Sequence, residues 1–153
     1  MSKKLKEIIW TFRIKLSWVR PACVRVIEIG SNASFLDLHE AIQTAVDFDN
    51  DHLFEFYLGR NPRNRAHAIG GEPDWDTFNP MKTYRNIKLS DVWPLPKGMN
   101  LYYLFDFGDN WLFQVNKTRH KDKTAQPGVA YPRVIEAKGK NPEQYPDYEE
   151  WYE

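Results

Sequence analysis

Three patterns in the sequence predict an α+β fold. Every second residue from Ile8 to Trp18 is apolar, which is typical of a half-buried strand. Residues 35–46 carry apolar side chains at helical spacing. Residues 100–119 contain two aromatic runs around a Gly-Asp-Asn turn, which predicts a β-hairpin. Hairpin strands combined with one helix define an α+β domain.

Length and composition predict a single domain over residues 1–153. A chain of this length, with 42% hydrophobic residues, buries about two thirds of its unfolded surface. Aromatic residues make up 15% of the chain, so we expect Phe, Tyr and Trp to form much of the core. The 21 basic and 21 acidic residues cancel, which excludes a strong general attraction to nucleic acid or to anionic membranes.

The only cysteine, Cys23, excludes an intrachain disulfide and a cysteine-based zinc site. The N-terminal residues lack the apolar segment and cleavage site of a secretory signal. The chain also lacks the run of about 18 apolar residues that a membrane-spanning helix needs. We therefore expect a soluble, cytoplasmic protein with no membrane partner.

The first two strands are predicted over residues 8–18 and 23–29. Apolar side chains occupy alternate positions of the first strand, from Ile8 to Trp18. Arg20-Pro21 ends that strand, because proline cannot donate a hydrogen bond to a sheet. The β-branched residues after Cys23 resume the strand pattern, so the two segments should form a hairpin.

The helix is predicted from Phe35 to Val46, because Ser34 followed by Asp37 resembles a capping box. Its apolar residues fall within one stripe, and a third strand follows at residues 53–58. The helical residues expected to face water are Asp37, Glu40, Gln43 and Thr44.

Residues 59–86 are interrupted by proline and glycine and show no sustained period, which predicts a long irregular excursion. Residues 89–92 predict a single helical turn, and the tail from Glu143 is acidic and aromatic. The excursion also contains apolar residues that indicate partial packing onto the core, namely Trp75, Phe78, Met81 and Tyr84.

The register of the aromatic hairpin follows from a predicted three-residue loop at residues 108–110. Phe107 then faces Trp111, and Phe105 faces Phe113. This register aligns apolar side chains on one face of the hairpin. We expect these four aromatic residues to be buried under the helix.

Five motifs occur in order along the chain: PACVRVIEI, LHEAIQTAVDFDNDHLFEF, KLSDV, YLFDFGDNWLFQV and YPRVIEAKGKNPEQ. Together they resemble the plasmid pRiA4b ORF-3-like family from about residue 10 to residue 145, and DFGDxW at residues 106–111 is the most specific part. The resemblance implies a roll-like α+β domain, with one main helix packed on a mostly antiparallel sheet, and no established activity. Family members occur on plasmids, so the link to mobile elements rests on resemblance alone.

Two positions depart from the family's pattern, since members usually carry histidine where this chain has Phe54 and Phe113. The phenylalanines argue against a metal or acid–base role at these positions. We expect the two rings to be neighbours on adjacent strands, where an aromatic pair adds about 0.5–1.5 kcal/mol beyond burial.

Two kinds of catalytic site remain open. His39, His52 and Glu55 could hold a metal ion, or His39 could be a buried histidine with its own hydrogen-bond partners. Asp106 and Asp109 could form an acid–base pair. The structural alternative is that Asp109 shapes the turn and that Asp106 pairs with an arginine. The sequence has no P-loop, GxGxxG, GxSxG or CxxC signature, so we expect no cofactor.

A basic strip on the polar face of the first hairpin is the candidate surface for nucleic acid. Arg13, Lys15 and Arg25 lie near Trp18 in the predicted strands, so they could meet phosphates while the ring stacks on a base. The same strip could instead be neutralised by the acidic segments of the chain. Neutralisation within the protein is the simpler account.

These observations favour a small cytoplasmic module that binds a partner, possible partners being proteins. A metal-dependent or acid–base hydrolase that uses carboxylates near the DFGD turn is the first alternative. A nucleic-acid-binding domain is the second alternative and is not favoured, because the chain has no net charge.

Overall fold

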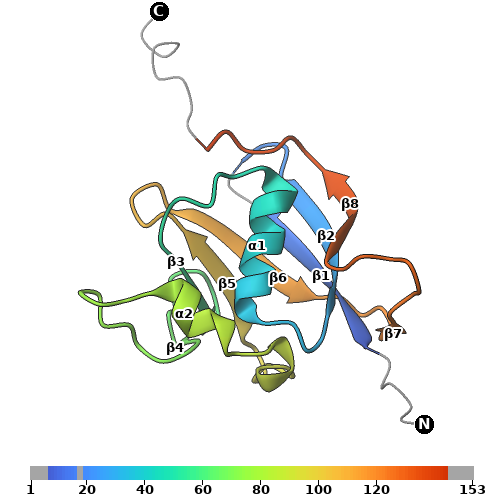
Figure 1. Ribbon diagram of the computed structural model, residues 1–153. Coiled ribbons are helices and arrows are strands. Elements are labelled where there is room, and N and C mark those ends of the chain that lie inside the picture. The colour runs from blue at the N-terminus through green and yellow to red at the C-terminus, as the bar shows by residue number, and fades with distance from the viewer. Residues whose placement is uncertain (1–6, 17–18, 145–153) are drawn as a thin grey trace, which may run out of the picture.

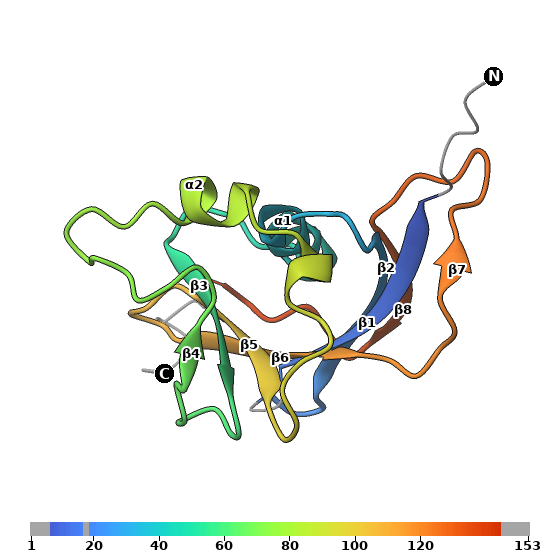
Figure 2. The ribbon, with the colours of Figure 1, turned by 90° about the horizontal axis from the view of Figure 1, so that it is seen from below.

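The computed structural model describes residues 7–16 and 19–144, which form one curved sheet with helices on one side (Figures 1 and 2). Its eight strands have the order β4-β3-β5-β6-β1-β2-β8, and β7 pairs with β1. Every strand pairing is antiparallel, which fits the predicted α+β class. The strands are β1 (Ile8–Leu16), β2 (Cys23–Gly30), β3 (Phe54–Gly59), β4 (His67–Ala68), β5 (Asn100–Phe105), β6 (Trp111–Lys117), β7 (Lys123–Thr124) and β8 (Arg133–Lys138).

The part of the chain that the structure describes also contains two α-helices and one 3-10 turn: α1 (Phe35–Val46), α2 (Pro80–Arg85) and η1 (Leu89–Asp91). The core lies between α1 and the sheet. Phe35, Leu38 and Ile42 of α1 are fully buried, and the Phe35 ring meets Phe56 of β3 at 5.0 Å between ring centres. Within the described ranges, no helix is long and apolar enough to cross a membrane.

The hairpin of β1 and β2 is confirmed. It pairs residues from Ile9 with Gly30 to Leu16 with Cys23. The predicted alternation is observed from Phe12 to Leu16, where Phe12 is buried and its neighbour Arg13 is exposed. It is wrong before Phe12, since Ile8 is 38% exposed whereas Thr11 is 5% exposed. The described part of the first strand ends at Leu16.

The helix begins and ends where the sequence predicts. Ser34 and Asp37 form the capping box, with each side chain accepting the backbone N–H of the other, at 3.0 and 2.9 Å. The helix ends at Asp47, which has a left-handed φ of 59°. One predicted helical residue is wrong: Gln43 was expected to face water but is 3% exposed, because it hydrogen bonds to groups from other segments.

The predicted register of the aromatic hairpin is wrong by two residues. Phe105 pairs with Trp111, and the loop spans residues 106–110 instead of 108–110. Asp106 causes this change, because it has a left-handed φ of 61° and its carbonyl accepts the backbone N–H of Asn110 at 2.7 Å. A shift of two keeps each side chain on its face, so the apolar face survives.

Phe107 is the exception among the four aromatic residues that we expected under the helix. Phe105, Trp111 and Phe113 are buried, whereas Phe107 is half-buried in the loop. Its ring meets Trp75 at 5.3 Å between ring centres. Phe107 therefore joins the hairpin loop to the excursion instead of packing under α1.

The excursion between β3 and η1 is only partly irregular, since it contains β4 and α2. Tyr84 of α2 is 2% exposed, and its hydroxyl accepts the backbone N–H of Phe56 at 2.9 Å. Phe78 is half-buried, whereas Trp75 and Met81 are about half exposed, at 52% and 44%. The packing expected of the excursion is therefore carried mainly by Tyr84.

Phe54 and Phe113 are not on adjacent strands as we expected, because β5 lies between β3 and β6. Both rings are 1% exposed. Tyr103 of β5 lies between them, at 6.0 Å from Phe54 and 5.8 Å from Phe113 between ring centres. The two positions share a buried aromatic layer without being cross-strand neighbours.

Candidate functional site

His39 lies in a closed ring of hydrogen bonds that joins α1, β5 and the loop before β3. Its Nδ1 lies 2.5 Å from the Tyr103 hydroxyl, and its Nε2 lies 2.5 Å from Oδ1 of Asn50. Gln43 donates to the same hydroxyl at 2.9 Å and accepts the backbone N–H of Asn50 at 3.0 Å. Each group can donate to the next one around the ring when His39 carries its proton on Nε2.

This environment makes His39 a buried, neutral histidine. The imidazole is fully buried and stacks on Phe54, with 3.5 Å between ring centres and 5° between the ring planes. Burial lowers the pKa of His39 from 6.5 to about 4, and the hydrogen bond to Asn50 opposes this shift only in part. Both ring nitrogens are already used within the fold.

The other two candidate metal ligands lie apart from His39. His52 is near the surface, with Nε2 at 3.4 Å from Oδ2 of Asp106 and 3.5 Å from Oδ1 of Asp51. Glu55 directly follows Phe54 in β3, so it lies on the opposite face of the strand from the Phe54 ring that stacks on His39. Oε2 of Glu55 accepts a hydrogen bond from Nη2 of Arg65 at 2.5 Å. Across the residues that the structure describes, no three His, Cys, Asp or Glu side chains form a group suited to a metal ion.

The two candidate catalytic carboxylates both lie in the loop between β5 and β6. Oδ1 of Asp106 accepts the backbone N–H groups of Gly108 at 3.1 Å and Asp109 at 3.3 Å. The other oxygen of Asp106 faces His52, where the sequence predicted an arginine. Asp109 is exposed. This geometry gives the Asp106 carboxylate a role in shaping the turn.

The four residues of the candidate basic strip do not share one described surface. Arg13 and Lys15 lie on the face away from α1, whereas Arg25 pairs with Ile14 and lies on the same face as α1. Trp18 lies outside the described residues. Arg25 is 4% exposed, and no acid within the described ranges forms an ion pair with it, so polar acceptors compensate its charge. Its guanidinium donates to the carbonyls of Val24, Ala45, Lys138 and Gly139 and to the side chain of Asn141.

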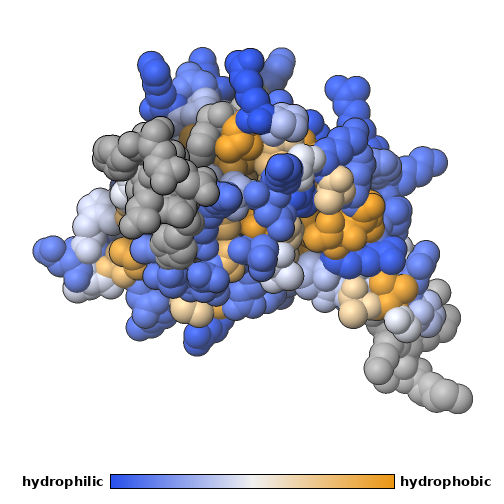
Figure 3. Space-filling model, turned by 90° about the horizontal axis from the view of Figure 1, so that it is seen from above, coloured by the Kyte–Doolittle hydropathy of each residue, from blue (hydrophilic) through white to orange (hydrophobic). Residues whose placement is uncertain are grey.

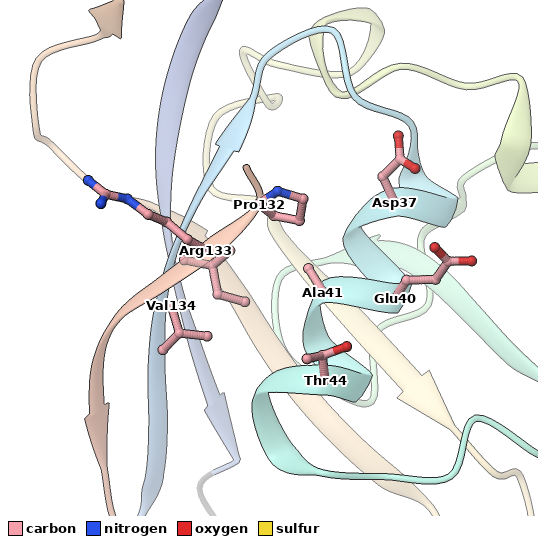
Figure 4. Close-up of a pocket in the computed structure, with 8 residues that line it drawn as sticks. Asp37, Glu40, Ala41, Thr44, Pro132, Arg133 and Val134 are labelled. Carbon is pink, nitrogen blue, oxygen red and sulfur yellow. The ribbon is translucent and has the colours of Figure 1, made fainter. Parts of the chain in front are cut away.

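A groove of about 300 Å³ lies between α1 and β8, where the sheet extends beyond the helix (Figure 4). Ile27 of β2 contributes to its floor and pairs with Val134 of β8. Figure 4 shows Ala41 of α1 pointing toward β8 across this space. The lining residues are Ile27, Asp37, Glu40, Ala41, Thr44, Pro132, Arg133 and Val134.

β8 forms one edge of the sheet, and all six of its residues are exposed. It pairs with β2 on one side, and no other strand in residues 7–16 and 19–144 pairs with it. Val134 and Ile135 are 43% and 45% exposed, and a bulge leaves Ile135 with no residue opposite it in β2. Exposed edge strands with apolar side chains offer unpaired backbone groups to other chains.

Two acids of α1, Asp37 and Glu40, lie along the groove, and both are exposed. Arg133 is the only base among the lining residues, and its Nε donates to Oε1 of Glu28 at 2.7 Å. Figure 4 shows the Arg133 side chain directed away from α1. Burial of Glu28 favours a raised pKa, but the hydrogen bonds from Lys123 and Arg133 lower the pKa below its usual range. The charge that remains along the groove is therefore acidic.

The comparisons with known proteins identify the family. The family model for the plasmid pRiA4b ORF-3-like protein matches residues 8–152. The chain belongs to this family. The crystal structure of a protein of unknown function, MM3350 from Methanosarcina mazei Go1, is similar, with a TM-score of 0.68 and 30% identity. The match covers 90% of this chain and 72% of MM3350.

A curated protein of similar sequence is the uncharacterized protein y4hQ of Sinorhizobium fredii (strain NBRC 101917 / NGR234). It is 27% identical to this chain over 131 residues. The match covers 85% of this chain and 62% of y4hQ, so this chain spans less than two thirds of that relative. Neither relative has a described function.

The pRiA4b ORF-3-like motifs map mainly onto structural features, and the groove was not predicted from the sequence. DFGDxW forms the loop between β5 and β6, and YPRVIEAK contains β8. Pro132 followed by two adjacent β-branched residues, Val134 and Ile135, was the available signal for an unusual edge strand. That signal could not show that α1 lies beside β8.

Proposed function

We propose that this protein is an interaction module that binds an extended segment of another protein along β8. The observation that carries the proposal is an exposed edge strand, with two apolar side chains, beside a groove. A peptide that adds to a sheet edge gains backbone hydrogen bonds, and alternate side chains of the peptide enter neighbouring pockets. The groove between α1 and β8 provides such a pocket.

The alternative as a hydrolase gains less support from the geometry. Asp106 uses one carboxylate oxygen to hold its own turn, and His39 uses both ring nitrogens within the core. A general base needs a side chain that can reach a substrate proton. His39 is fully buried and cannot meet this requirement without opening of the fold.

A cytoplasmic setting and a link to mobile elements form part of the same proposal. The free, buried Cys23 is compatible with a reducing compartment. The link to mobile elements follows only from the family's association with plasmids. A protein that only binds a partner is compatible with both the reducing cytoplasm and the plasmid association, because neither requires this chain to be a catalyst.

Selection from a displayed library of random peptides tests the proposal. The wild-type protein should retain clones that a Val134→Ser/Ile135→Ser variant no longer binds, because the change removes apolar contacts without adding charge. Leu53→Ser/Ile8→Ser is a matched control, since Leu53 and Ile8 are 45% and 38% exposed and do not line the groove. Thermal melts should confirm that both variants fold.

Clones that bind the wild type and the control, but not the β8 variant, would support the proposal. Amide NMR signals of residues 133–138 should then shift when such a peptide is added. The absence of any β8-dependent clone would overturn the proposed function.

A further inference from the structure

We infer that the segment bound along β8 is basic, with lysine or arginine at positions that face α1. This inference rests on the proposed function and adds the chemistry of the partner. It follows from three observations: the acidic charge on α1, the ion pair that Arg133 makes with Glu28, and the alternation of side chains in an added strand.

The α1 wall of the groove is acidic. The helical sequence FLDLHEAIQTAV contains no lysine or arginine, and its exposed residues are Asp37, Glu40 and Thr44. Asp47 follows directly after the helix and is also exposed. Among the residues described, Glu40 makes no ion pair within 4.0 Å, although it lines the groove. A cation in the groove would therefore meet carboxylates that no base in residues 7–16 and 19–144 neutralises.

The β8 wall does not offset this charge. The guanidinium of Arg133 and the ammonium of Lys123 both bind the Glu28 carboxylate, each at 2.7 Å. Glu28 pairs with Arg133 on the face of the sheet away from α1. Arg133 is therefore held outside the groove, and its charge is directed to the opposite face.

An added strand would place alternate side chains toward α1. Successive side chains of a strand point to opposite faces, so every second residue of the segment would lie over the groove. One apolar residue can occupy the space between Ala41 and Val134, and residues two positions away can reach the acidic rim at Asp37 and Glu40. The expected pattern is an apolar side chain flanked by basic side chains at alternate positions.

A second copy of this chain suits the groove less well. Two β8 strands that pair antiparallel around a two-fold axis would bring both α1 helices to the same side of the joined sheet. The acidic residues of both helices would then face each other across the new interface. Like charges at an interface disfavour association, so the charge pattern favours a different, basic partner.

Binding of three defined peptides tests the inference by fluorescence anisotropy. Each short peptide has one central valine, with lysine, glutamine or glutamate two positions before and two positions after it, and threonine at the positions between, so that the varied side chains and the valine share one face. The wild type is expected to bind the lysine peptide about five- to tenfold more tightly than the glutamate peptide, since partly exposed ion pairs contribute modestly. This preference should shrink as salt is added, because salt screens exposed charges.

Glu40→Lys should reverse the preference between the lysine and glutamate peptides, and Glu40→Gln should weaken it. Asp109→Lys is the matched control, because it makes the same change of charge at an exposed residue of the β5–β6 loop. It should leave the preference unchanged. Asp37 is left intact in these variants because it caps α1.

The outcomes separate this inference from the proposed function. If all three peptides bind equally and Val134→Ser/Ile135→Ser abolishes binding, β8 is a docking edge and the basic preference is wrong. If no peptide binds and the library yields no β8-dependent clone, both proposals are wrong. If the signals of β8 shift with protein concentration alone, the edge pairs with a second copy and the inference is overturned.

Discussion

Acidification from pH 7 to pH 5 is expected to destabilise the fold through a single buried side chain, His39. The unfolded chain takes up a proton on this histidine near its ordinary pKa of 6.5, whereas the folded chain takes it up only near pH 4. The pKa is depressed because the imidazole is fully buried. The stabilisation is therefore complete above pH 6.5 and is lost as the pH falls toward 4.

The size of this effect follows from the difference between the two pKa values. Each unit of difference corresponds to about 1.4 kcal/mol, so His39 contributes up to about 3 kcal/mol to the pH dependence of stability. About 2 kcal/mol of this should be lost between pH 7 and pH 5, where most carboxylates remain ionised. Such a loss is a large share of the stability of a typical domain.

Urea unfolding at pH 7 and pH 5 measures this loss, and two variants isolate its source. In His39→Gln the pH dependence should fall by about 2 kcal/mol, because no group at this position titrates. His120→Gln is the control, since His120 is an exposed histidine whose Nδ1 lies 2.7 Å from the Thr118 hydroxyl. It should keep the wild-type pH dependence.

A direct NMR titration provides the decisive check. If the His39 ring titrates near pH 6.5 in the folded protein, the buried, neutral state is wrong. Equal pH dependence in the wild type and in His39→Gln would lead to the same conclusion.

Trp111→Ala is expected to cost about 3–5 kcal/mol in urea unfolding, because Trp111 is 6% exposed and packs on Phe48. Arg65→Ala should cost on the order of 3 kcal/mol at neutral pH, since the buried Glu55 carboxylate loses its partner. Adding Glu55→Gln should recover part of this loss. Arg25→Met should cost on the order of 3 kcal/mol, because five acceptors lose a charged donor. Duplex DNA should bind with a Kd no tighter than about 10⁻⁴ M at about 150 mM salt, because the chain has no net charge. Micromolar binding by fluorescence anisotropy that weakens steeply with salt would contradict this last expectation.

The parts of the fold that the sequence predicts well depend on local signals. Ser34 and Asp37 specify the start of α1 through contacts that span only three residues. The alternation in β1 and the proline after it likewise define the first hairpin. In each case the residues that determine the element lie within or beside it.

The incorrect predictions involve groups whose partners are distant in the sequence. The backbone N–H of Asp106 donates to the carbonyl of Leu53, and Asp106 adopts a left-handed φ. The loop therefore begins at Asp106, although the aromatic side chain of Phe107 suggests that the strand continues through residue 107. Gln43 has a polar side chain at a helical position that looks exposed, but the buried Tyr103 hydroxyl and the backbone N–H of Asn50 supply its partners. Neither contact leaves a local pattern in the sequence.

The groove could not be predicted for the same reason, because β8 joins the sheet by pairing with β2, which lies more than a hundred residues earlier in the chain. The pairing of Glu28 with Arg133 places the segment after Pro132 beside α1. No periodicity in residues 133–138 identifies this neighbour. The candidate site therefore depends on topology, whereas the candidates taken from the sequence were individual reactive side chains.

Arg25 is relevant to the groove, because its buried guanidinium donates hydrogen bonds to both α1 and β8, the two walls of the groove. It donates to the carbonyl of Ala45 in the last turn of α1 and to the carbonyls of Lys138 and Gly139 at the end of β8. Carbonyl groups at a helix C-terminus carry partial negative charge, so they can compensate a buried cation without a carboxylate. A groove whose walls are fixed before binding costs less conformational entropy to occupy. The residue that was expected to contact an external phosphate is thus better placed to fix α1 and β8 relative to each other.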